Sequence, residues 1–233
     1  IPCYNIITWN VRGLSSASKQ YKIHMYLKSK RAHIAMLQET HMSQEGLEKI
    51  RRKWGGSVCG TTASSFARGV LIWISREVPY IVVNSVTDPD GRYVVIEGAL
   101  DGCPLALVAV YAPNAGHAAY LRRLTPALLA DPRIPVIWGG DYNAVLDIEL
   151  DRSTPPLRGT YSCAATGILK EWKANIDTHD IWRLQHPDIK EYSFFSHVHK
   201  LHTRIDLFLC TASLMCCITD TRYLPRTHSD HNP

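Results

Sequence analysis

The chain has 233 residues, of which 45% are hydrophobic and 20% are charged, as in an ordinary globular protein with a sizeable core. The formal net charge is +5 at pH 7 and there are eleven histidines, a balance that fits a polyanionic partner without establishing one. The longest apolar stretch, around residues 105–112, falls far short of the roughly 20 residues that a membrane span needs. We therefore expect no membrane partner.

The seven cysteines are scattered, odd in number and without a C-x-x-C pair. Adjacent Cys216 and Cys217 are poorly placed to pair with each other or to share a metal ion. We therefore expect reduced thiols, no disulfides and an intracellular protein. The chain shows no signal peptide and begins at Ile1, so we expect a segment of a longer protein. Because no repeat or linker-like change of composition interrupts it, we expect one domain over residues 1–233.

The first half of the chain alternates apolar runs with turns and amphipathic stretches. Residues 4–9 and 34–37 predict strands. Between them we expect a helix that either Ser15 or Ser16 can cap. A short polar helix and four further strands follow, at residues 44–54, 70–74, 81–83, 93–96 and 105–110. The turns between these strands give a meander, so the sheet cannot be wholly parallel.

The second half centres on residues 134–143, an apolar run that ends in two glycines before a carboxylate and an amide. Glycine allows a sharp turn and a close approach of the backbone to a bound group. Asp141 and Asn143 lie two positions apart, and in a nearly extended chain they face the same side. The other elements that we expect are helices at 117–130, 163–173 and 177–185, and strands at 192–195, 204–209 and near Ile218.

Polar side chains of related chemistry follow or begin six of the predicted strands. They are Asn10, Glu39, Tyr111, Asp141 with Asn143, Asp206, and Asp230 with His231. Each one alone is more often a solvated turn residue or half-buried packing. Together they supply the hard oxygen ligands that Mg²⁺ prefers and a histidine that a carboxylate can hold. The set therefore predicts metal-assisted hydrolysis of a phosphodiester.

Six short motifs, in this order, resemble those of the endonuclease/exonuclease/phosphatase family. They are Thr-Trp-Asn-Val-Arg-Gly-Leu, Leu-Gln-Glu-Thr, Val-Tyr-Ala-Pro-Asn, Gly-Gly-Asp-Tyr-Asn, Thr-Arg-Ile-Asp and Ser-Asp-His-Asn-Pro. The chain is most similar to the apurinic-like endonuclease domain of LINE-type (non-LTR) retrotransposons, particularly in residues 150–153 and 192–195. The resemblance implies an α/β (α+β) fold, a four-layer α/β sandwich in which two packed mixed β-sheets are flanked by helices. Family members usually continue into a closing strand after the position of Pro233, so we expect that strand to be missing.

The resemblance implies a metal site at one edge of the two sheets. Glu39 is the principal ligand of Mg²⁺, for which Mn²⁺ can substitute, with Asn10 nearby and Asp230 supporting the metal side. Two residues after Asn10, repair enzymes of the family carry a second acidic residue, where this chain has Arg12. An arginine cannot ligate a cation, so an auxiliary metal position that used that carboxylate is in doubt. Arg12 either holds a DNA phosphate or forms a surface salt bridge.

The resemblance also implies the roles of the reacting groups. Asp206 orients His231, which meets the scissile phosphate. Asp141 handles a proton, either activating water or protonating the leaving 3′ oxygen. Asn143 and Tyr111 position or stabilise the phosphate. Whether Asp141 or His231 is the base, and whether one or two metal ions act, stays open.

We predict an endonuclease that requires Mg²⁺ and nicks one strand of duplex target DNA to leave a 3′-OH and a 5′-phosphate. In the retrotransposon context that the resemblance implies, this 3′-OH primes reverse transcription by the reverse transcriptase domain of the same polyprotein, in the nucleus. The alternative within the family is an endonuclease that repairs abasic sites. Lipid and inositol phosphatases share the fold, but they would not nick a plasmid. An alternative of another class is a catalytically inactive DNA-binding module.

Sequence specificity requires loops that reach a groove, because the phosphate and sugar are the same at every step. Residues 196–203 lie between two predicted strands and should form the tip of a hairpin beside the cleavage site. Its histidines and lysine suit a groove of negative potential, and Val198 or Leu201 could wedge a base step. The candidate DNA-binding residues are Arg12, Arg152, His197, His199, Lys200, His202, Thr203 and Arg204.

Overall fold

The computed structural model of the chain describes residues 2–63, 67–128, 131, 133–154 and 164–233. Within these residues the N-terminal third forms a four-stranded sheet in the order β1-β2-β4-β3. Its first two strands are parallel and the other pairs are antiparallel. The elements are β1 (Ile6–Asn10), α1 (Ala17–Ser29), β2 (Ile34–Gln38), α2 (Gln44–Lys53), β3 (Ser57–Thr61) and β4 (Val70–Ile74).

The remainder of the described chain forms a six-stranded sheet in the order β5-β6-β7-β8-β12-β9. The pair β7 and β8 is parallel and the other pairs are antiparallel. The strands are β5 (Tyr80–Thr87), β6 (Tyr93–Leu100), β7 (Cys103–Tyr111), β8 (Val136–Asp141), β9 (Thr178–Asp180) and β12 (Asp206–Thr211). The helices are α3 (His117–Leu128), α4 (Ala164–Asn175), α5 (Ile181–Gln185) and the 3₁₀ helix η1 (Ala212–Cys217).

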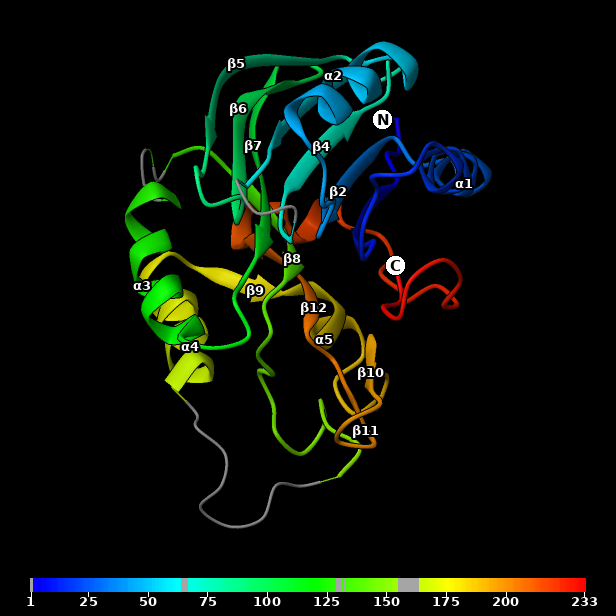
Figure 1. Cartoon of the computed structure of the whole chain (residues 1–233). Helices are drawn as coiled ribbons and strands as arrows, with labels where there is room; N and C mark the ends of the chain where they lie inside the picture. The colour runs from blue at the N-terminus through cyan, green and yellow to red at the C-terminus, as the bar shows by residue number, and fades with distance from the viewer. Residues whose placement is uncertain (1, 64–66, 129–130, 132, 155–163) are drawn as a thin grey trace.

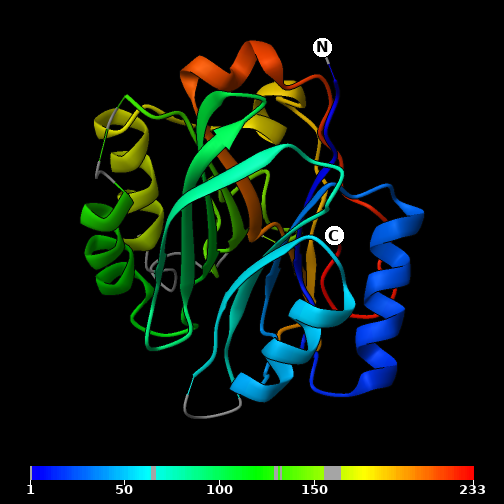
Figure 2. The ribbon, with the colours of Figure 1, turned by 90° about the horizontal axis from the view of Figure 1, so that it is seen from above.

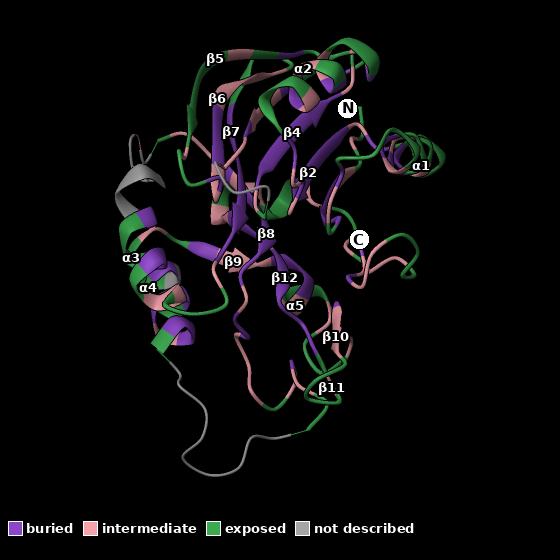
Figure 3. Cartoon of the chain, viewed as in Figure 1, coloured by how far each residue is buried: buried purple, intermediate pink, exposed green. Residues whose placement is uncertain are grey.

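The two sheets pack face to face between two outer layers of helices (Figure 1). Figure 2 shows the layers edge-on, with α1 and α2 outside the four-stranded sheet and α3 and α4 outside the six-stranded sheet. Three apolar clusters fill the three spaces between layers, and the middle one contains Met36, Ile72 and Leu107. Figure 3 shows that most strands are buried while the outer faces of the helices are exposed. The four-layer sandwich expected from the motifs is therefore confirmed.

A small antiparallel hairpin, β10 (Phe194–Ser196) and β11 (Leu201–Thr203), projects beside the start of β12 (Figure 1). Its tip, residues 197–200, is shorter than the eight residues expected, because residues 201–203 pair with 194–196. All four tip residues are exposed. The predicted hairpin is confirmed, and it hydrogen-bonds to the segment around Ser153, since the Ser153 N–H donates to the His202 carbonyl and the His202 N–H to Ser153 Oγ.

Several predicted elements differ from the structure. Strand β3 was not predicted, because residues 57–61 include a glycine and small polar residues that give a weak strand signal. The helix expected at 177–185 divides into β9 and α5, with Asp180 as the N-cap of α5. The strand expected near Ile218 is absent from the described residues, where η1 ends and an irregular segment continues to Pro233. Residues 129, 130 and 163, at the ends of two predicted helices, lie outside the described residues.

Capping and burial follow the sequence pattern at α1. The Ser16 side chain accepts the N–H of Lys19, which selects Ser16 over Ser15 as the cap. Ile23 and Leu27 are fully buried.

None of the described helices is long and apolar enough to cross a membrane. The six described cysteines carry free thiols.

Candidate active site

The polar strand ends meet at one edge of the two sheets. Asn10 ends β1, Glu39 follows β2, Tyr111 ends β7 and Asp141 ends β8. Asp206 begins β12 and pairs in register with Asp141, which in turn pairs with Tyr111. The antiparallel start of β12 therefore lies beside the ends of the parallel strands. This arrangement explains how residues far apart in sequence converge.

The backbone is strained at this edge. Arg12, Glu39 and Asn143 have φ values of 46°, 50° and 47°, in the left-handed region that residues with a side chain rarely adopt. Such conformations cost free energy and persist where the surrounding structure enforces them, often at functional sites. Each of the three follows a strand end by one or two positions.

The Asn10 amide connects the two sheets. Its Nδ2 donates to Oε1 of Glu39 at 2.9 Å and to Oδ2 of Asp141 at 3.0 Å, and it lies 3.5 Å from Nε2 of His231. Its Oδ1 accepts the backbone N–H of Arg12 at 3.0 Å. Asn10 is fully buried. In this geometry its oxygen faces the backbone of Arg12, so Asn10 joins the two carboxylates through its nitrogen.

His231 and Asp206 form a buried pair, with Nδ1 of His231 2.8 Å from Oδ2 of Asp206. The other ring nitrogen, Nε2, lies 3.9 Å from Oδ2 of Asp141. Burial alone would lower the pKa of His231, but the charge and hydrogen bond of Asp206 together with the charge of Asp141 raise it to about 9. Burial and the Asp206 charge raise the pKa of Asp141 to about 7. The structure thus brings Asp206 and His231 into hydrogen-bond contact.

Several residues that hold this pair were not predicted as site residues from the sequence. Ser193 Oγ accepts the backbone N–H groups of Ile205 and Asp206, at 3.1 and 3.0 Å. The Tyr223 hydroxyl donates to the Asp206 carbonyl at 2.6 Å. On the other side, the Trp9 indole N–H donates to the His231 carbonyl at 3.1 Å. Short-range patterns cannot reveal such contacts, because the partners lie up to 222 positions apart.

Tyr111 and Asn143 border the same centre. Burial and the negative charges of Glu39 and Asp141 raise the pKa of Tyr111, so its hydroxyl remains a hydrogen-bond donor at neutral pH. The Arg92 guanidinium lies 4.8 Å from the centre of its ring. Asn143 donates its backbone N–H to Oδ1 of Asp141 at 2.9 Å and its side-chain amide to the Ala112 carbonyl at 2.7 Å. Asn143 therefore holds the Asp141 carboxylate in place.

Arg12 and Asp230 bind each other at the mouth of the site, with Nη1 of Arg12 2.6 Å from Oδ2 of Asp230. Of the two possibilities for Arg12, the structure shows the salt bridge. The Arg12 side chain is still 64% exposed, so it remains accessible to a ligand. The contribution of Asp230 to a metal site would require it to share its carboxylate with Arg12.

The centre fits a hard divalent cation. Two of its carboxylates, Asp206 and Asp230, already face a cationic partner in His231 and Arg12. The hydrogen-bond donors to Glu39 and Asp141 are neutral groups such as the Asn10 amide and the Asn143 backbone N–H. Each of these carboxylates also has a more distant histidine, His41 at 3.4 Å from Glu39 and His231 at 3.9 Å from Asp141. Carboxylate oxygens with uncompensated charge are the preferred ligands of Mg²⁺ and Mn²⁺.

A second set of donor atoms lies deeper in the same centre. One ligand atom each of Asp141, Asp206 and His231 lies within 4.8 Å of the others. Oδ1 of Asp206 is buried without a hydrogen-bond partner in the described part of the chain. Nδ1 of His231 and Oδ2 of Asp206 already bind each other, however, whereas the Glu39 side chain is 21% exposed. Glu39 is therefore the more accessible ligand.

A cavity of about 250 Å³ opens beside His231. It is lined by Tyr192, Phe194, Phe195, His202, Arg226, Asp230 and Asn232. The Phe194 ring, which lines this cavity, lies 4.5 Å from the His231 ring, so the cavity is close to the reacting centre and to the hairpin. Aromatic rings beside a guanidinium suit a sugar or a base next to a phosphate.

The predicted DNA-binding residues divide into two groups. His197, His199 and Lys200 are exposed at the hairpin tip, and His202 is exposed beside it, 4.6 Å from the Phe195 ring. Arg12 is exposed as described. Arg152 forms an isolated bridge with Thr203 and donates from Nε to the Thr154 carbonyl at 3.3 Å.

One of these predictions is wrong. Arg204 is fully buried and its guanidinium binds Asp151 and Asp180, so it cannot contact DNA. Thr203 is buried in β11 and offers little surface to a ligand. An arginine beside a histidine-rich loop resembles a surface cation in the sequence. Its two carboxylate partners lie 53 and 24 positions away, which local patterns do not reveal.

The fold and the site define a nuclease-like hydrolase centre, and comparisons with known proteins agree. The model of the endonuclease/exonuclease/phosphatase family matches residues 7–231, so the chain belongs to this family. Its structure is similar to AP endonuclease LMAP from Leishmania major, with a TM-score of 0.77 and 19% sequence identity over 98% of this chain and 85% of that one. It is also similar to the catalytic domain of Xenopus laevis APE2, with a TM-score of 0.73 and 17% identity over 97% and 89% of the chains. At these identities the similarity shows an AP-endonuclease-like fold.

Proposed function

We propose that the protein is an endonuclease that requires Mg²⁺, or Mn²⁺ in its place, and nicks one strand of duplex DNA to leave a 3′-OH and a 5′-phosphate. The observation that supports this most is the Asn10 amide, which joins Glu39, Asp141 and the His231–Asp206 pair into one centre at the sheet edge. An inactive DNA-binding module would have no use for this array. The test is nicking of supercoiled plasmid with Mg²⁺ and with a chelator.

In this proposal Glu39 holds the metal ion, which when bound would offset the negative charge that develops on the phosphate. His231, whose pKa is raised to about 9, is protonated at neutral pH, so its Nε2–H can donate to a phosphate oxygen. Asp206 keeps that ring in place. The hydroxyl of Tyr111 is a further donor at the border of the centre.

Proton transfer belongs to Asp141 in this scheme. A protonated His231 cannot accept a proton, whereas the pKa of Asp141 is raised to about 7, close to the pH at which the enzyme would act. A general base is most effective when its pKa lies near the working pH. Asp141 can therefore take the proton of the attacking water, with Asn143 and Asn10 fixing one oxygen each.

For the biological role we propose the endonuclease domain of a LINE-type retrotransposon, with residues 1–233 as one domain of a longer polyprotein. The support is the likeness of residues 150–153 and 192–195 to that branch and the presence of Arg12 where repair enzymes have an acid. The 3′-OH would prime synthesis by the reverse transcriptase domain of the same polyprotein, in the nucleus. The exposed hairpin tip at residues 197–200 would contribute to the choice of target sequence.

The second candidate is an endonuclease acting at abasic sites, which the similarity to two AP endonuclease structures favours. The two proposals differ in substrate. A retrotransposon endonuclease nicks intact duplex at preferred sequences, whereas a repair enzyme requires the abasic lesion. Rates on two duplexes of the same sequence, one with a single abasic site, distinguish them.

A further inference from the structure

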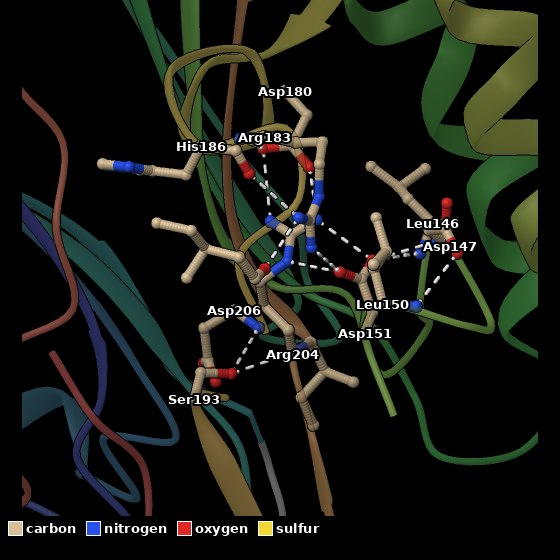
Figure 4. Close-up of polar contacts among 12 residues, drawn as sticks. Leu146, Asp147, Leu150, Asp151, Asp180, Arg183, His186, Ser193, Arg204 and Asp206 are labelled. Atoms are coloured by element: carbon tan, nitrogen blue, oxygen red, sulfur yellow. Dashed lines mark hydrogen bonds and ion pairs between the residues drawn. The ribbon is translucent and has the colours of Figure 1, made fainter. Parts of the chain in front are cut away.

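Arg204 is a fully buried cation with four hydrogen bonds to two carboxylates (Figure 4). Its Nε and Nη2 donate to the two oxygens of Asp151 at 2.7 and 3.0 Å. Its Nη1 and Nη2 donate to the two oxygens of Asp180 at 3.2 and 2.6 Å. Its guanidinium also lies 5.2 Å from the centre of the Trp182 ring. A single guanidinium thus binds two carboxylates in the bidentate manner.

The partners of Arg204 hold further segments. Asp151 accepts the N–H groups of Leu146 and Asp147 at 3.2 and 2.9 Å and a 2.7 Å bond from Nη2 of Arg183. Arg183 in turn donates to the carbonyls of residues 186, 187 and 189. We call Arg204, Asp151, Asp180 and Arg183 the Arg204 cluster. It joins the loop that follows Asn143, the start of α5 and the junction between β11 and β12.

The Arg204 cluster lies between the reacting centre and the hairpin. Arg204 stands two residues before Asp206, whose backbone N–H, like that of Ile205, donates to Ser193 Oγ (Figure 4). The backbone N–H of Arg204 donates to the Asp151 carbonyl at 2.9 Å. Arg152, which follows Asp151, and Thr203, which precedes Arg204, form an antiparallel bridge that supports β11. A displacement of Arg204 would therefore be passed to Asp206 on one side and to the hairpin on the other.

A buried ion pair of this kind is a poor source of stability, because desolvation of the charges offsets most of their attraction. What it supplies is geometry, since the planar guanidinium fixes both carboxylates in direction as well as distance. A lysine carries the same charge but donates from one point and cannot make two bidentate contacts.

We propose that Arg204 is a positioning residue that holds Asp206, and through it His231, at a fixed place relative to the hairpin. The proposal rests on the endonuclease function proposed above. Arg204 touches no reacting atom, so its effect is on the alignment of the phosphate with the centre and on which phosphate is presented.

The test is Arg204→Lys, compared with Leu27→Ala as a variant that lowers stability from the far side of the four-stranded sheet. Leu27 is fully buried in the apolar cluster on that sheet's outer face, and its side chain has no polar atom that could bind the reacting centre. Melting temperature, DNA affinity, kcat, the map of nick sites and the imidazole ¹⁵N shifts of His231 are measured for both. The His231 signals are assigned by their loss in His231→Asn.

We expect Arg204→Lys to keep DNA affinity within about twofold while kcat falls by about 10- to 100-fold, since sub-ångström misplacement is enough for such losses. Its nick map should broaden and its His231 shifts should move. Leu27→Ala, assayed well below its melting temperature, should keep the wild-type kcat, map and shifts. If Arg204→Lys does not fold, Asp180→Asn takes its place, because asparagine retains the α5 cap and removes one charge of the cluster.

The proposal is overturned if the Arg204→Lys or Asp180→Asn protein has the kcat, nick map and His231 shifts of the wild type, because Arg204 would then serve stability alone. A wild-type protein that fails to nick any DNA would refute the proposed function instead. In that case the ¹⁵N shifts still decide whether Arg204 positions His231.

Discussion

At the scale of residues, the reacting centre contains three side chains of different chemical character. In the proposed mechanism Glu39 offers the accessible carboxylate, Asp141 acts as the base and His231 is the cationic donor. The Asn10 amide nitrogen donates to one oxygen of Glu39 at 2.9 Å and to one oxygen of Asp141 at 3.0 Å. These two hydrogen bonds hold the carboxylates near each other against their mutual electrostatic repulsion. The geometry of the centre therefore includes a neutral amide as well as the charged groups.

Alanine at Glu39, Asp141 or His231 should lower the rate of nicking by at least about a hundredfold, because each supplies a separate metal, proton-transfer or charge-stabilising role. DNA binding should survive much better, since phosphate contacts elsewhere supply most of the affinity. The rate of plasmid nicking measures the loss of catalysis, and binding isotherms on a duplex measure the DNA affinity of each variant. A Glu39→Ala protein that nicks at the wild-type rate with Mg²⁺ would remove Glu39 as the ligand.

The stability of the metal-free protein should depend on pH through His231. Its pKa is about 9 in the folded state against about 6.5 in an unfolded chain, so folding binds a proton. The resulting stabilisation is complete below pH 6.5 and is lost as the pH rises through about 9, with an upper limit of roughly 3 kcal/mol. His231→Asn can still donate to Asp206 but does not titrate.

Chemical denaturation of both proteins between pH 6 and 10, with a chelator present, tests this expectation. The advantage of the wild type over His231→Asn in free energy of unfolding should shrink as the pH rises. A difference that stays constant across this range would mean that His231 is not protonated in the folded protein.

At the scale of elements, we propose that the hairpin of β10 and β11 reads the target sequence. Its tip is exposed, with Val198 85% exposed between two histidines. Its base is fixed to residues 151–153 and through Arg204 to β12. A fixed base with an exposed tip can insert into a groove at a defined distance from the cleaved phosphate.

Replacing residues 197–200 by a short turn that contains glycine should shift or blur the nick sites while nicking itself persists. The replacement leaves residues 201–203 in place, because the His202 backbone binds Ser153 and should not be disturbed. Nick sites on one long duplex are mapped for both proteins. An unchanged map would exclude the hairpin tip as the specificity element.

Sequence patterns predicted the elements whose signal is local. The strand ends at Asn10, Glu39, Tyr111 and Asp141 were recognisable because an apolar run stops at a polar residue in each case. The burial of Arg204 was not predictable, since its partners are distant in sequence and arginines are mostly exposed. The segment after Cys217 was also mispredicted, because tertiary contacts such as that of Tyr223 with Asp206 hold it instead of a strand ladder.

At the scale of the whole molecule, the four-layer sandwich brings together two sets of strand ends that belong to different sheets. Asn10 and Glu39 come from the four-stranded sheet, and Asp141 and Asp206 from the six-stranded one. His231 lies on the irregular C-terminal segment. Its carbonyl accepts the Trp9 indole N–H, and its ring contacts the Phe194 ring. The site therefore exists only when both sheets are packed, and any variant that loosens the interface between them should lose nicking together with its cooperative unfolding.

The most direct test of the account is nicking of a long intact duplex with the breaks mapped at nucleotide resolution and the ends tested for direct resealing by DNA ligase. We predict single-strand breaks at a limited set of preferred steps, dependent on a divalent cation, with ends that the ligase reseals because they carry a 3′-OH and a 5′-phosphate. Breaks that appear only at abasic sites, breaks that form equally well with a chelator present, or ends that the ligase cannot join would contradict it.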